Sequence, residues 1–200
     1  SSYWTAGSVS PKLNTTGPAL SPSIPVDTVT APLVVGAGSV ASPLMSVSIV
    51  GLEVEILDFV TLSGDFGFRK SSGNIEVAAQ NVEAKLVAGP VEVGVDNGTL
   101  ALLLKADGTK ALDASGSLIF VVDGFGSATA DSVTVKMNTT GPALSTSITV
   151  DTVTAPLVVG AGSDASPLMS VAIVGLGVEI LDFVTLSGAF GFRKSSGNVE

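Results

Sequence analysis

The sequence predicts an all-β protein built as an elongated tandem repeat of antiparallel strands. Three observations support this prediction: apolar and polar residues alternate over most of the chain, Asn-Gly and Asp-Gly pairs separate the alternating runs, and residues 14–76 recur as residues 138–200. We expect long bent strands in meanders, either sandwich-like or curved into a half-pipe. A β-solenoid is the alternative, because the major turns recur every 16 to 19 residues.

The repeat divides the chain into two units of unequal length. Residues 14–76 and 138–200 are identical at 56 of 63 positions, without a gap and 124 residues apart. We therefore expect a first unit at residues 1–124 and a partial second copy of it at residues 125–200. The natural protein is expected to hold further copies, because near-identical units that pack on one another build arrays.

The first glycine-rich stretch, APLVVGAGSVASPLMS at residues 31–46, resembles a dinucleotide-binding fingerprint with an acidic residue, Glu55, about 20 positions on. That fingerprint requires a helix after the glycines, whereas the following residues alternate between apolar residues and serine, as in a strand. The second copy places Asp164 in the loop, where it would repel a phosphate. We therefore expect a strand, a glycine loop and a strand, with Gly36 and Gly38 at backbone angles that other residues avoid.

The later runs are expected to pair as hairpins. Residues 66–79, FGFRK-SSGN-IEVAA, carry the clearest signal, a turn sequence between two alternating runs. Breaks in the alternation at Asn81 and around residues 114–116 predict β-bulges inside strands of about 13 to 15 residues. Further turns are expected at residues 96–98, 106–109 and 123–126.

Positions that differ between the copies are expected to face solvent. Three of them, Ser48, Glu53 and Asp65, are replaced by alanine or glycine in the second copy and alternate with apolar neighbours. Glu53 also lies close to Glu55 and Asp58, which raises the question of an acid–base group. Because the second copy has glycine in place of Glu53, we interpret these carboxylates as solvated strand residues.

The composition excludes several classes of function. The net charge is −9 and the nine Lys and Arg residues are not clustered, so a nucleic-acid partner is not expected. The chain has no His and no Cys, which removes the commonest general base, nucleophile and soft metal ligands. We expect no enzyme, no catalytic residue and no organic cofactor. No export signal or apolar run of membrane-spanning length is visible either.

Two weaker signals concern ligands and modification. Asp96, Asp107 and Asp123 lie in or near predicted turns, where carboxylates can bind calcium, although Asp is common in turns without any metal. These three residues are therefore weak calcium candidates, and no other metal site is predicted. Asn-x-Thr sequons, the acceptor sequence for glycosylation, occur in predicted turns or connections at Asn14, Asn97 and Asn138.

Two long stretches of the repeat, NVEAKLVAGPVEVGVDNGTLALLLKADGTKALDASGSL and DFVTLSGDFGFRKSSG, resemble the tandem repeats of giant bacterial cell-surface proteins of the adhesin-like and filamentous types. The resemblance implies an extracellular or cell-surface location and a structural role in a stalk or fibre, and it carries over no site residue. The expected partners are neighbouring repeat units or identical subunits. The alternative function is a binding module, with an apolar groove for lipid or a sheet face for glycans.

Overall fold

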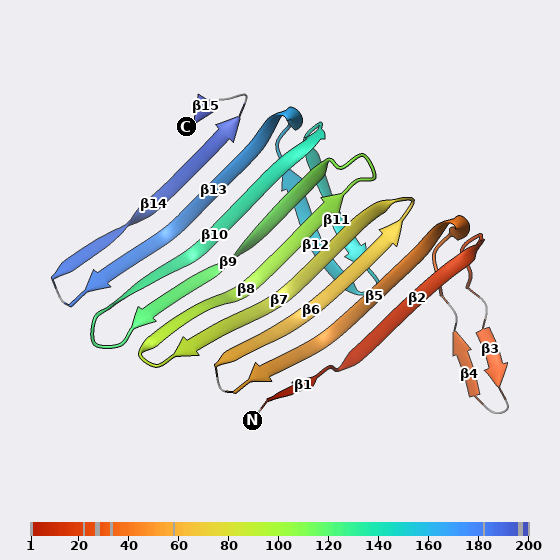
Figure 1. The fold of residues 1–200 in the computed structure, drawn as a ribbon, viewed down its shortest axis with the longest axis horizontal. Helices are drawn as coiled ribbons and strands as arrows, with labels where there is room; N and C mark the ends of the chain where they lie inside the picture. The colour runs from red at the N-terminus through yellow and green to blue at the C-terminus, as the bar shows by residue number, and fades with distance from the viewer. Residues whose placement is uncertain are drawn as a thin grey trace.

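The protein is all-β in the computed structural model, which describes residues 2–21, 23–26, 29–32, 34–57, 59–181, 183–195 and 198–199. These residues form antiparallel meandering strands in an open sheet (Figure 1) and contain no helix, so none that is long and apolar enough to cross a membrane. The strands are β1 (Tyr3–Thr5), β2 (Ser8–Gly17), β3 (Ser23–Val26), β4 (Val29–Pro32), β5 (Gly38–Ile56), β6 (Val60–Ser71), β7 (Asn74–Ala88), β8 (Val91–Leu104), β9 (Lys110–Val122), β10 (Gly126–Gly141), β11 (Leu144–Val150), β12 (Val153–Val159), β13 (Gly162–Ile180), β14 (Val184–Ser195) and β15 (Asn198–Val199).

One large sheet contains most of the strands. β1 and β2 both pair with β5, and from β5 the sheet continues through β6, β7, β8, β9, β10, β13 and β14 to β15. The two copies of the repeat form matching ladders within it. Leu13 of β2 faces Met45 of β5, and their counterparts Met137 and Met169 face each other in β10 and β13. The sheet therefore passes from one copy into the next without interruption.

Three of the predicted turns are confirmed. Ser72 and Gly73 join β6 to β7 with positive φ angles, and glycines with positive φ stand in the turns β8–β9 and β9–β10. The turn predicted at residues 96–98 is wrong. Those residues lie inside β8, where Asn97 has a φ of 51° and the register with β9 shifts between Asp96 and Thr99. An Asn-Gly pair supplies the same positive φ to a β-bulge as to a hairpin turn.

The bulges of neighbouring strands line up across the sheet. Asn81 in β7 has a φ of 54° and lies at a register shift, as the break in alternation predicted. The second bulge, predicted around residues 114–116 of β9, is wrong, because the register shifts there place the extra residue in the neighbouring strands β8 and β10. In β8, Asn97 and Gly98 together lie opposite Gly116. Gly51 in β5 and Gly64 in β6 have positive φ at the equivalent level. Because a bulge bends its strand, the long strands are bent where this line crosses them, with one half of each strand on either side.

Two hairpins leave the large sheet at equivalent points. Along the chain, the hairpin of β3 and β4 comes between β2 and β5, and the hairpin of β11 and β12 comes between β10 and β13. Figure 1 shows β11–β12 lying across one face of the sheet at a steep angle to its strands, whereas β3–β4 projects beyond the edge strand β2.

The main core lies between hairpin β11–β12 and the sheet. Along β12 buried and exposed residues alternate strictly, so that the hairpin turns one apolar face toward the sheet. The buried cluster consists of Ala78, Ala101 and Ala111 from the sheet with Ile148, Val150, Val153, Ala155, Leu157 and Val159 from the hairpin. The second copy thus covers strands of the first.

Candidate functional site: the hairpin seat

Hairpin β11–β12 rests on a row of small residues that crosses four strands of the sheet. The row, called the hairpin seat below, consists of Ser48, Gly67, Ala78 and Ala101, each of which is the register partner of the next. Asp113 of β9 and Lys136 of β10 continue the row at one end. Small side chains allow the hairpin backbone to come close to the sheet, so its larger Val, Ile and Leu residues fill the space between the layers.

Gly67 sets the closest approach in the hairpin seat. A Cβ atom at this position would lie 2.7 Å from Cβ of Val150, which is 1% exposed. No real Cβ packs at that distance, so any larger residue would push the hairpin away. The matching position in the second copy, Gly191, has nothing within 4 Å of such an atom.

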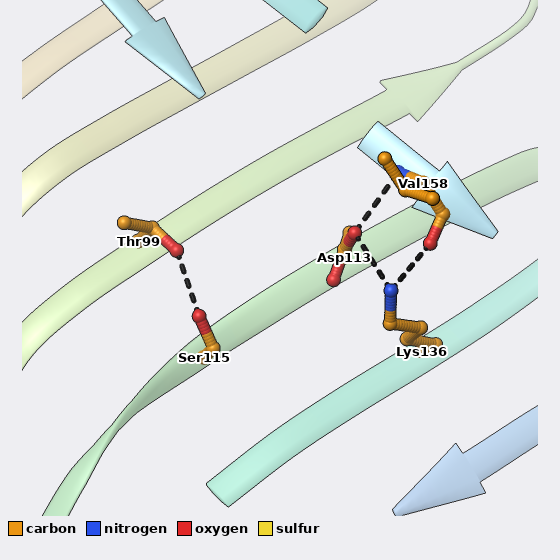
Figure 2. Close-up of polar contacts among 5 residues, drawn as sticks. All are labelled: Thr99, Asp113, Ser115, Lys136 and Val158. Carbon is orange, nitrogen blue, oxygen red and sulfur yellow. Dashed lines mark hydrogen bonds and ion pairs between the residues drawn. The ribbon is translucent and has the colours of Figure 1, made fainter. Parts of the chain in front are cut away.

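Polar side chains of the sheet bind the backbone of β12. The Thr154 amide donates to Oε1 of Gln80 at 3.1 Å, and the Val158 amide donates to Oδ2 of Asp113 at 2.9 Å. Lys136 Nζ donates to the Val158 carbonyl at 2.6 Å and to Asp113 at 3.2 Å (Figure 2). Backbone groups at the edge of a two-stranded hairpin need such partners when they are covered. These bonds fix the register of the hairpin on the sheet.

The tip of the hairpin is tied to the start of the first copy. Asp151 accepts hydrogen bonds from Lys12 Nζ at 2.8 Å and from Ser48 Oγ at 3.0 Å. The Lys12 ammonium, together with the Ser48 hydroxyl, lowers the pKa of the Asp151 carboxyl below its usual value. Ser48 is 3% exposed, so the prediction that it faces solvent is wrong. Its surroundings come from a hairpin more than 100 residues away in sequence.

An asparagine holds the root of each hairpin. Asn138 is fully buried, and its side-chain amide donates to the carbonyls of Pro142 at 2.8 Å and Gly160 at 2.7 Å. Asn14 makes the same two bonds in the first copy, at the same distances. Asn14 and Asn138 therefore lie in strands and not in turns, which corrects the location predicted for these two sequons. Sequence reasoning missed this role, although each Asn precedes a Gly-Pro pair by three residues.

The glycine loop of the first copy confirms a strand, a connection and a strand. Gly36 precedes β5 and no helix follows it. The reason predicted for the glycines is wrong, because neither Gly36 nor Gly38 has a positive φ. A Cβ on Gly38 would instead lie 2.3 Å from the carbonyl oxygen of Asn14. Glycine is needed there because two backbones meet at the hairpin root.

The sheet face opposite the hairpin carries an apolar hollow of about 360 Å³ at the line of bulges. Its lining includes a row of register partners across five strands, Phe66, Ala79, Leu100, Ala114 and Val135. Phe68 beside this row is 43% exposed, and its second-copy counterpart Phe192 is 60% exposed. Within the described residues, this apolar face has no covering layer comparable to the hairpin.

Two of the three carboxylates considered for acid–base chemistry lie in β5, next to strand β1. Glu53 and Glu55 lie in β5 opposite Thr5 and Tyr3, and Asp58 lies outside the described residues. Asp65, predicted to face solvent, accepts bonds from the Gly51 amide and from the side chains of Gln80 and Asn81, and these bonds lower its pKa. Asp65 thus joins three neighbouring strands, β5, β6 and β7, at the line of bulges.

The calcium candidates lie apart from one another. Asp107 is in the turn before β9 and Asp123 in the turn after it, so the length of a 13-residue strand, roughly 40 Å, separates them. Asp96 lies within β8, beside the bulge at Asn97. Asp107 accepts bonds from the Thr109 amide and hydroxyl, which lower its pKa. In the part of the chain that the structure describes, no three acidic residues gather in a way that could hold a metal ion.

Comparison with known proteins adds no relative. No protein-family model, no curated protein and no solved structure matches the chain.

Proposed function

We propose that the chain is a structural repeat of an extracellular cell-surface adhesin or filament, which forms an elongated stalk or fibre without catalysis. The observation that carries this proposal is the continuous sheet across the copy boundary. β10 of the second copy pairs with β9 of the first and with β13 of its own copy. In such an array, the last strand of each copy pairs with the first strand of the next copy, as β9 pairs with β10 here. Repeat proteins grow along one axis in this way.

The proposal predicts a definite length for each copy. Six strand-to-strand steps lead from β2 to its counterpart β10. At about 4.8 Å a step, one 124-residue copy adds roughly 29 Å. The composition fits an exposed array, because a net charge of −9 keeps copies in solution and the lack of cysteine avoids disulfide exchange. The partners are then neighbouring copies of the same unit.

Electron microscopy of chains with two, three and four complete copies tests this function. We expect straight or gently curved particles whose length rises by roughly 29 Å for each added copy. A control chain with the same copies separated by flexible Gly-Ser linkers should show beads at irregular spacing. Compact particles whose longest dimension does not grow with copy number would contradict a stalk or fibre.

The apolar hollow supports a second candidate function, lipid binding. Its lining surface is almost wholly apolar, although Thr99, Ser115 and Ser117 contribute to it. The hollow follows the line of bulges from strand to strand, which suits an extended acyl chain better than a glycan. Titration with a fluorescent fatty acid tests this candidate. We expect Leu100→Gln to weaken fatty-acid binding about tenfold or more, because the side-chain amide of the glutamine would lie against the acyl chain without a hydrogen-bond partner. Glu83→Gln, at an exposed site, is the control, and equal binding by both variants would exclude the hollow.

A further inference from the structure

The two copies of the repeat show the same sheet positions with and without a hairpin above them. In the first copy, Ser48 and Gly67 are buried beneath β11–β12. Their counterparts, Ala172 in β13 and Gly191 in β14, are exposed. The two sequences around these positions are nearly identical, so the difference in exposure comes from what lies over and beside them. In the first copy the hairpin covers both positions and β7 flanks β6, whereas within the described residues β14 pairs on its far side only with the two residues of β15.

We propose that Lys136, Ala172 and Gly191 form the start of a second hairpin seat, which receives the β11–β12 hairpin of a following copy. This inference rests on the proposed array, because it places the next copy in line with the second. The occupant is defined by the seat already filled in this chain, where the residues Lys12, Ser48 and Gly67 receive the same hairpin. A following copy of the unit would bring an identical hairpin to the equivalent distance.

Lys12 and its second-copy counterpart Lys136 bind opposite ends of the same hairpin. Lys12 binds Asp151 at the tip of the hairpin that covers its own copy. Lys136, the same residue one copy later, binds the Val158 carbonyl near the root of a hairpin, together with Asp113. A lysine ammonium has three N–H donors, so two are used at Lys136 and one remains for an arriving aspartate. In an array, each such lysine therefore joins the root of its own hairpin to the tip of the following one.

The result is a second layer of hairpins laid end to end along one face of the sheet. One hairpin reaches from its root at β10 across β9, β8, β7 and β6 to β5 and to Lys12 in β2, which is the full width of a unit. The next hairpin would end where the first begins. One contact differs, because Ala172 cannot donate the hydrogen bond that Ser48 gives to Asp151.

Carbodiimide cross-linking tests the second seat, since this reagent joins a carboxylate to an amine only when the two are in contact. The sample is the full chain lengthened after Glu200 by a further copy of residues 77–200, with Thr149→Ser in the added hairpin as a mass label. We expect a cross-linked peptide between the added tip aspartate and Lys136. The Lys12–Asp151 product, expected in both the original and the lengthened chain, is the internal control.

The outcomes separate this inference from the proposed function. Lys136→Arg, made only in the original copy, should remove the new product and leave the Lys12 product, because the guanidinium does not couple. If the lengthened particle grows by one unit and the Lys12 product forms while the Lys136 product does not, the second seat is refuted and the array stands. If the particle does not grow, both the array and the second seat are refuted.

Discussion

Lys12 Nζ lies 2.8 Å from Oδ1 of Asp151, although 139 positions separate the two residues in the sequence. The contact joins a strand of the first copy to the hairpin tip of the second. Both side chains keep about 30% of their surface exposed, so the ion pair alone adds little stability. Its value lies in fixing where the hairpin ends.

The hairpin tip should be held less firmly in acid. The lowered pKa of Asp151 means that its carboxylate contributes stability above the unfolded value of about 3.9, and this contribution is lost as the pH falls through the lower folded pKa. Hydrogen exchange of residues 148–154, corrected for intrinsic rates, should therefore lose protection below about pH 4. Asp151→Asn should reduce this pH dependence, leaving the part due to Asp65 and Asp107, whose pKa values are also lowered. The same acid response in both proteins would contradict the role of Asp151.

Gly67→Val should destabilise the protein by about 1–3 kcal/mol, because the new Cβ would enter the space of Val150. Gly191→Val is the matched control at the same position of the second copy, where the space is open. There the change should lie within about 0.5 kcal/mol, since valine suits an exposed strand. Chemical unfolding measures both. Equal losses would show that strand glycine itself matters, and not the hairpin above it.

Leu157→Ala should lower the free energy of unfolding by about 2–5 kcal/mol. Leu157 is fully buried between hairpin and sheet, so its removal leaves a cavity in the main core. The neighbouring Val158, which is 45% exposed, provides the control Val158→Ala, expected to cost less than about 1 kcal/mol. If the two variants unfold at the same denaturant concentration, the hairpin does not pack on the sheet in solution.

Asn138→Ala should cost about 2 kcal/mol or more, because it leaves two carbonyls at the hairpin root without their donor. Asn74→Ala is the control, since Asn74 accepts a single bond from the Ala106 amide at a turn. Thermal unfolding should place the Asn138 variant well below the control. A smaller loss for Asn138 than for Asn74 would mean that water replaces the root bonds.

The sequence predicted the parts of the fold that depend on local chemistry. The alternation of residues identified the antiparallel strands, and the turns at residues 71–74 and 106–109 followed from their glycines. The error at residues 96–98 has a physical cause, because positive φ is required by hairpin turns and bulges alike. Local signals show where the backbone bends but not whether the chain reverses.

The hairpin seat was not predictable in the same way. Residues 144–159 alternate like any other strand pair, and nothing local shows that they fold back over β5–β9. The seat itself consists of one Ser, one Gly and two Ala residues that lie 11 to 23 positions apart in sequence and meet only through the register of the sheet. Ser48 looked solvent-facing for this reason, since the group that buries it comes from the other copy.

The direction of the hairpin has a mechanical consequence. Hydrogen bonds between strands point across the sheet, so tension along a row of strands pulls directly on these bonds and opens one ladder at a time. Hairpin β11–β12 crosses the same ladders at a steep angle and is held at its root by Asn138 and at its tip by Lys12 (Figure 1). Its covalent backbone then carries part of the load between these two anchors. A pulled array should therefore yield at a hairpin tip before its strands separate.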